Sequence, residues 1–181
     1  MDEQMEVFQK GEKVMYPQFG LGTVSEVTEK QVNGSNLAFY RLEFTVKQME
    51  ILVPVQRARE NGLRRVMSRK EVKELVKYLT HAPNGAKSQQ WHRWRKKTLE
   101  QLKSGDPIEI ANIYCYLCSL ESSKGLSFTE RKILTQVERM LVAEIAVALR
   151  VTEAHAERMI AAPKHNGKLP ELNLRKTKAA G

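Results

Sequence analysis

The sequence predicts an α+β protein in which a small antiparallel β-barrel, of the Tudor-like or SH3-like kind, precedes an all-helical part of about five helices. Up to residue 55, polar and apolar residues alternate in short runs that turns interrupt, as in strands. From Ser68 onward the apolar residues follow the helical period of about 3.6. The change of period places the border between the two parts near residue 66.

Charge supports the same division. Residues 1–66 hold nine basic and nine acidic side chains, so the whole net charge of +9 lies beyond them. A basic excess of this size favours a polyanionic partner, nucleic acid before membrane. We therefore expect a neutral barrel domain over 1–66, a basic helical domain over 67–162 and a flexible basic tail over 163–181.

The predicted strands are separated by turn residues. Asn33-Gly34 is a strong two-residue hairpin signal, because both central residues need a positive φ. The strand-like runs are Lys13–Tyr16, Thr23–Val27, Gln31–Val32, Ala38–Thr45 and Met49–Val53. A barrel of this size buries one row of side chains, for which the candidates are Val14, Val24, Tyr40, Leu42, Phe44, Ile51 and Val53.

Capping residues mark the helix starts. They are two capping boxes, Ser68 with Glu71 and Ser127 with Glu130, and single caps at Asp106 and Thr152. The helices predicted from these caps and from the apolar stripes cover about 68–80, 90–103, 106–124, 127–149 and 152–160.

The basic segment 87–103 (KSQQWHRWRKKTLEQLK) carries the clearest functional signal. It contains both tryptophans of the chain, Trp91 and Trp94, among six basic residues and one acidic residue. Basic residues beside an aromatic ring are typical of nucleic-acid binding, since the charges hold phosphates while the ring stacks on or wedges between bases. The alternative is a solvated charged face above two core tryptophans. Trp91 is the better candidate for an exposed ring, because it lies at the helix start.

No catalytic or metal site is predicted. Cys115 and Cys118 form a C-x-x-C in mid-helix, where we expect them to pack in the core rather than act in redox or zinc chemistry. The four histidines form no known catalytic or metal-binding pattern, and no phosphate-binding glycine loop is present. We therefore expect a protein that is not an enzyme and that needs no cofactor and no metal.

The barrel offers an edge that could accept a strand of a partner protein. The candidate lies around the Asn33-Gly34 hairpin, with the residues Lys30, Val32, Phe39 and Arg41. The alternative is an unengaged edge that its basic residues protect from aggregation.

Four stretches resemble the CarD/CdnL family of bacterial RNA-polymerase-binding transcription regulators. They are FQKGEKVMYPQFGLGTV, VPVQRARENGLRRV, QQWHRWRKKTLEQLKSGD and ERMLVAEIAVAL, within residues 8–160. The first stretch is also similar to the RNA-polymerase-interacting domain of the transcription-repair coupling factor.

The resemblance implies that the Tudor-like barrel binds the RNA polymerase β subunit by aligning an edge strand with it. It implies that the helical domain stabilises the promoter open complex at the upstream edge of the bubble, in the minor groove and without sequence specificity. Trp91 falls at the family's wedge position, and Arg93, Arg95, Lys96 and Lys97 fall among its phosphate contacts. Lys30 and Leu52 fall where some members carry polymerase-facing arginines, so Leu52 is a departure from that pattern.

A stand-alone, non-specific nucleic-acid-binding protein is the alternative function. Its helical part would act without polymerase. For either function we expect a cytoplasmic monomer, associated with the nucleoid through polymerase in the first case. The acidic N-terminus does not look like a signal peptide, and no apolar run approaches the roughly 20 residues of a membrane span.

Overall fold

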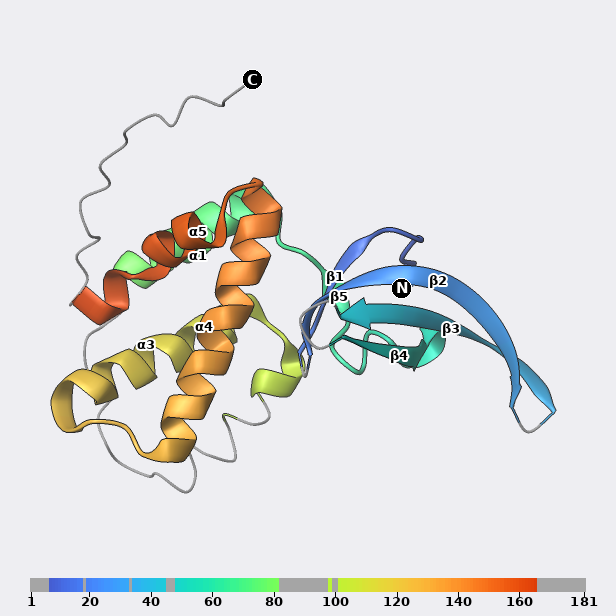
Figure 1. The fold of residues 1–181 in the computed structure, drawn as a ribbon, viewed down its shortest axis with the longest axis horizontal. Coiled ribbons are helices and arrows are strands. Elements are labelled where there is room, and N and C mark those ends of the chain that lie inside the picture. Colours follow the sequence, from blue (N-terminus) through green and yellow to red (C-terminus); the bar gives the residue numbers. More distant parts are fainter. Residues whose placement is uncertain are drawn as a thin grey trace, which may run out of the picture.

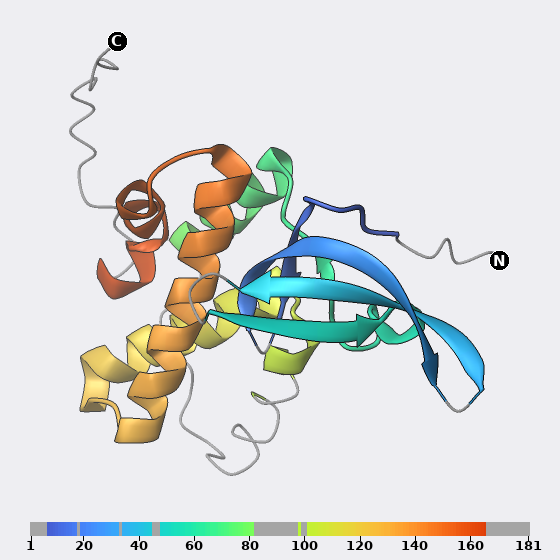
Figure 2. The same ribbon diagram turned by 45° about the vertical axis from the view of Figure 1, so that its right-hand side comes forward.

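The computed structural model describes residues 7–165, except 18, 33, 45–47, 82–97 and 99–100. The sheet and the helices lie side by side, and the hairpin of strands β2 (Gly20–Val32) and β3 (Ser35–Phe44) projects away from the helices (Figure 1). In a view turned by 45°, the long helix α4 (Phe128–Leu149) stands beside the sheet (Figure 2). The predicted α+β class, with a barrel-like antiparallel sheet before a set of helices, is confirmed.

The sheet has five antiparallel strands in the order β4-β3-β2-β1-β5. Their bounds are Lys13–Tyr16 for β1, Gly20–Val32 for β2, Ser35–Phe44 for β3, Met49–Pro54 for β4 and Arg64–Arg65 for β5; the short 3₁₀ helix η2 covers Val55–Arg57. Val32 pairs with Ser35, so the predicted hairpin with a two-residue connection is confirmed; residue 33 itself lies outside the described residues.

Two strand predictions were wrong. The runs Thr23–Val27 and Gln31–Val32 belong to one strand, β2, because the three residues between them, 28–30, also pair with β3. The fifth strand is instead Arg64–Arg65, which is too short to show a periodicity in the sequence.

The barrel core contains six of the seven predicted residues, whereas Ile51 is only partly buried. Phe8 and Leu63 also belong to this core and were not predicted. The hydroxyl of Tyr40 accepts a hydrogen bond from the N–H of Phe8 at 3.2 Å, which ties the start of the chain to β3.

The helices begin at the predicted caps. Their bounds are Arg69–His81 for α1, Pro107–Lys124 for α3, Phe128–Leu149 for α4 and Glu153–Ile160 for α5, and the 3₁₀ helix η3 follows at Ala162–His165. Asp106 accepts from the N–H groups of Ile108 and Glu109, and Ser127 forms a capping box with Glu130. Of the helix predicted for 90–103, residues 98 and 101–103 are described and helical, and the helix continues to residue 104.

Register explains how the sheet meets the helices. Met15 pairs with both Leu21 and Arg64, so these three side chains share one face of the sheet. Met15 lies in the core of the helical part, and Leu21 packs against it. We call this the outer face, since the opposite face covers the barrel core. Among the described residues, no helix is long and apolar enough to cross a bilayer.

Candidate functional site

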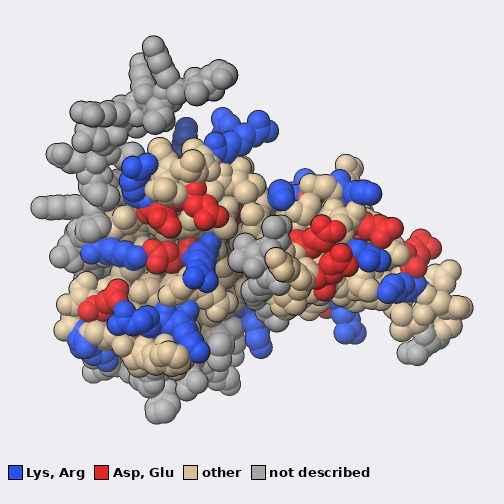
Figure 3. All heavy atoms as spheres, viewed as in Figure 1, with Lys and Arg blue, Asp and Glu red and all other residues tan. Residues whose placement is uncertain are grey.

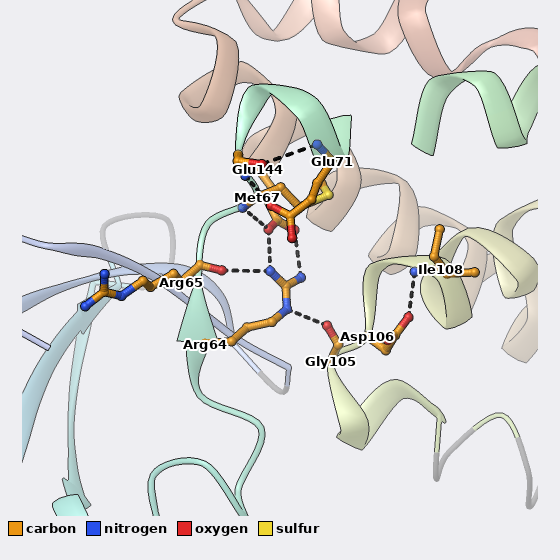
Figure 4. A network of polar contacts seen from close by, with 9 residues as sticks. Arg64, Arg65, Met67, Glu71, Gly105, Asp106, Ile108 and Glu144 are labelled. Carbon is orange, nitrogen blue, oxygen red and sulfur yellow. Dashed lines mark hydrogen bonds and ion pairs between the residues drawn. The ribbon is translucent and has the colours of Figure 1, made fainter. Parts of the chain in front are cut away.

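Arg64 joins the sheet to two helices through a network of polar contacts (Figure 4). Its Nη1 and Nη2 donate to the two carboxylate oxygens of Glu144 on α4, with 2.9 Å between Nη2 and Oε2. Its Nε donates to the carbonyl oxygen of Gly105, just before α3, at 2.6 Å. The N–H of Met67 also donates to Glu144 Oε1, at 2.9 Å. One arginine thus fixes β5, α3 and α4 relative to one another.

Glu144 is 1% exposed, so its carboxylate depends on these donors. A buried ionised carboxylate is tolerated only when it is paired and its remaining oxygens are hydrogen-bonded. Sequence analysis missed this residue, although a signal was present. Glu144 interrupts the otherwise apolar run LVAEIAVAL, three residues after Leu141 and seven after Val137, so it lies on the same side of the helix as these two apolar residues.

Two glycines bring the backbones of the two parts together beside this network. Gly62 and Gly105 have positive φ angles of +80° and +70°. A Cβ on either would lie 2.7 Å from Cγ of Pro17, and on Gly62 it would also lie 2.7 Å from the carbonyl oxygen of Lys103. We call the region formed by Arg64, Glu144, Gly62 and Gly105 the junction. It has no space for a side chain at either glycine.

The four residues predicted to contact a protein partner share the outer face of the sheet. The pairs Arg41–Glu26, Phe39–Thr28, Lys30–Leu37 and Val32–Ser35 lie along the β2–β3 ladder. Paired residues point to the same side, and so does every second residue of a strand. This face is opposite to that of Tyr40, Leu42 and Phe44, which point into the barrel core.

The four residues differ in their exposure to solvent and in the number of strands beside them. β1 pairs with β2 only up to Thr23, so Lys30 and Val32 lie on a part of β2 that has one neighbouring strand among the described residues. Both side chains are exposed. Phe39 and Arg41 are partly buried on β3, with β2 on one side and β4 on the other. The assignment of all four to a protein partner stays a prediction.

The terminal strand β4 is an edge that sequence analysis did not single out. Among the described residues it pairs with β3 alone, from Met49 opposite Phe44 to Pro54 opposite Phe39. Leu52 lies on its outer face, opposite Arg41, and is 38% exposed. A proline at the end of the run is typical of edge strands. The outer face of the hairpin and this free edge thus form one continuous surface, which we call the hairpin surface.

The predicted DNA-contacting residues lie outside the described residues. They are Trp91, Arg93, Arg95, Lys96 and Lys97. The next described part of the segment points inward, because Thr98 and Leu102 are buried. Elsewhere on the helices, a group of basic side chains is visible at the lower end of the helical part in Figure 3, whereas acidic and basic side chains mix on the sheet.

The two cysteines pack in the helical core, as predicted. Cys118 is buried and Cys115 partly so. Burial raises the pKa of Cys115 to about 11 and that of Cys118 to about 12, so both stay protonated thiols near neutral pH. Among the described residues, no group of His, Cys, Asp and Glu is placed to hold a metal ion.

Comparisons with known proteins match both parts of the chain. Residues 8–67 match the family model described as the CarD-like/TRCF RID domain, and residues 74–161 match the CarD C-terminal domain. A Bacillus subtilis protein named "Putative transcription factor YdeB" is 22% identical over 147 residues, which cover 81% of this chain and 95% of that protein.

The fold and these matches define a class of protein: transcription factors in which a domain that interacts with RNA polymerase precedes a helical domain. Within this class, the chain belongs to the CarD family.

Proposed function

We propose that this protein binds the β subunit of RNA polymerase through the hairpin surface and stabilises the promoter open complex through the helical part. The observation that carries the proposal is the junction. It joins a projecting, exposed sheet surface to the basic helices by a buried ion pair, so that a contact made by one part positions the other.

On the polymerase side, an edge strand of the β subunit would add to the sheet. Strand addition gains affinity from main-chain hydrogen bonds and specificity from alternate side chains. The free edge of β4 supplies unpaired main-chain groups, and Lys30, Val32, Phe39 and Arg41 supply side chains on the adjoining outer face.

On the DNA side, the proposed contacts are those of the Trp-containing basic segment. Trp91 would wedge into the minor groove at the upstream edge of the bubble, while Arg93, Arg95, Lys96 and Lys97 hold phosphates. Such contacts recognise a distorted duplex rather than a base sequence. They should therefore act at many promoters.

The junction explains why weak DNA contacts suffice. A protein tethered to polymerase meets the promoter at an effective concentration in the millimolar range, provided that the connection has the right reach. A rigid connection sets this geometry better than a flexible one. The proposal includes no catalytic step and no cofactor, and it places the protein in the cytoplasm as a monomer bound to polymerase on the nucleoid.

The lifetime of open complexes on one promoter, with and without the Trp91→Ala variant, tests the proposal. Loss of one stacked ring is worth about 1–3 kcal/mol, so we expect a roughly five- to hundredfold loss of the stabilising effect with normal polymerase binding. An unchanged lifetime would rule out the wedge. The alternative, a stand-alone DNA-binding protein, predicts that charge reversal at Lys30 leaves both polymerase pull-down and open-complex lifetime unchanged.

A further inference from the structure

A groove of about 690 Å³ is lined by residues of the sheet and of α4. One wall is formed by the sheet, from Phe19 to Thr23, with Lys13 and Phe44. The other wall is formed by α4, from Phe128 to Ala143. The groove has the size of sites that bind a peptide segment or small ligand. It continues the outer face that carries the hairpin surface, since Leu21 and Thr23 lie on that face.

The floor of the groove is apolar. Phe19, Leu21 and Met140 line it, and the first two of these are only partly buried. At one end, Phe128 is 74% exposed, with the ammonium of Lys132 4.4 Å from its ring centroid. A phenylalanine side chain that is this exposed contributes little to the stability of the fold. An exposed apolar group bordered by charges is typical of an interaction surface.

The rim of the groove is basic. Its charged residues are Lys13, Arg131, Lys132, Arg139 and a single acid, Glu153. Arg131 pairs with Glu121 at 3.4 Å. Within the described part of the chain, neither Lys132 nor Arg139 has an acidic partner. Three more bases than acids thus border an apolar floor, and at least two of these bases are free to pair with a ligand.

We propose that this groove binds an acidic protein segment that carries a large apolar anchor side chain and is presented by the transcription complex. This inference rests on the proposed function, because polymerase is what brings the segment to the groove. Charge complementarity speeds the encounter and sets the orientation, and the anchor gains affinity by leaving water on the floor. Occupation would also cover Phe128.

The observations favour a protein segment over nucleic acid. A phosphate backbone needs a continuous basic track, whereas the bases here are divided between two walls by apolar side chains. An amphipathic segment with acidic flanks matches both the rim and the floor, as in helix-in-groove recognition. The groove also continues the face that we assign to protein contact.

Site-specific photo-crosslinking tests the proposal in the full chain. A benzoylphenylalanine replaces Gln136, which is exposed and lines the groove, and the protein is irradiated in complex with RNA polymerase holoenzyme and a promoter fragment. The same group at Val32 reports the hairpin surface, and at Lys73, exposed on α1, it reports background. We expect Gln136 to crosslink to an acidic stretch of one polypeptide of the complex.

Charge reversal then tests the chemistry. Arg139→Glu should reduce the Gln136 adduct at least tenfold, whereas Lys73→Glu, a matched control outside the groove, should leave it unchanged. A Gln136 adduct to DNA, an adduct no stronger than at Lys73, or an equal effect of both reversals would overturn the groove proposal. Suppose that the groove proposal is overturned in one of these ways. If the crosslinker at Val32 also gives no polymerase adduct, the proposed function fails as well; if the crosslinker at Val32 does give one, only the groove proposal fails.

Discussion

Arg64 in the junction and Arg41 on the hairpin surface are both arginines of the sheet that pair with glutamate, yet they serve different ends. Arg64 meets a carboxylate that is 1% exposed and also binds two main-chain carbonyl groups, those of Gly105 and Arg65. Arg41 lies between Glu26 at 3.3 Å and Glu50 at 3.4 Å, and both of these carboxylates are exposed to solvent.

The difference shows which arginine is committed to the fold. Breaking a buried pair leaves a charge without water or partner, which costs several kcal/mol. An exposed pair contributes about 0–1 kcal/mol, because water replaces each partner at little cost. Arg41 can therefore exchange its glutamates for a carboxylate of a partner protein, while Arg64 cannot leave Glu144 without loosening the connection between the two parts.

The largest expected effect comes from breaking the junction pair. Glu144→Ala leaves the Arg64 guanidinium without its carboxylate partner and the Met67 N–H without its acceptor, so we expect a loss of about 3–5 kcal/mol of unfolding free energy in denaturant melts. Glu144→Gln keeps the shape and one acceptor oxygen, and it should cost less. Equal stability of Glu144→Ala and the wild type would show that the ion pair does not hold the junction.

Two glycine-to-alanine variants separate the cost of backbone strain from the cost of a steric clash with a neighbouring side chain. Gly34→Ala, at φ +81° in open space, should cost about 1 kcal/mol, because an alanine there is only strained. Gly105→Ala meets Pro17 Cγ at 2.7 Å as well, so we expect an additional loss of about 1–3 kcal/mol from overpacking. Thermal unfolding of both variants measures the difference. Equal losses would mean that Pro17 moves aside without cost.

Variants on the hairpin surface should separate binding from stability. Lys30→Glu and Val32→Asp change exposed residues, so unfolding free energies should stay within about 0.5 kcal/mol of the wild type. Polymerase pull-down should nevertheless fall about tenfold, which corresponds to about 1.4 kcal/mol. Lys73→Glu on α1 is the matched control. Normal pull-down by both variants would contradict the docking surface.

The smallest effect on stability is expected from a rise in salt concentration. Raising salt screens the exposed pairs of Arg41 but hardly affects Glu144, so thermal stability should change little. DNA binding by the full chain should weaken steeply over the same range, since each phosphate contact releases a counterion. Fluorescence anisotropy with a labelled duplex at several salt concentrations checks this. A salt-independent affinity would count against phosphate contacts.

Local signals made much of the fold predictable. The capping boxes at Ser68 and Ser127 each depend on residues three positions apart, and both are present as expected. The strand β5 was not predictable, because two residues carry no period and their pairing with β1 depends on contacts distant in sequence. The role of Arg64 was hidden for the same reason, since its partner Glu144 lies 80 residues further along the chain.

Part of the candidate site was predictable, because side chains alternate along a strand and this alternation decides which face each residue occupies. Lys30, Val32, Phe39 and Arg41 share one face because Val32 pairs with Ser35, which is the register that a two-residue hairpin connection gives. The free edge of β4 depends on the strand order of the whole sheet, which no local pattern gives.

The separation of 80 residues between Arg64 and Glu144 has a consequence for the nascent chain. At about 5–20 residues per second, roughly 4–16 s pass between the synthesis of Arg64 and that of its partner. All strands of the sheet precede residue 66, so the sheet can form in that interval while Met15, which packs into the helical core, is still exposed. A ribosome stalled before Glu144 would therefore hold a folded sheet whose outer face exposes apolar side chains, and a chaperone would bind such a surface.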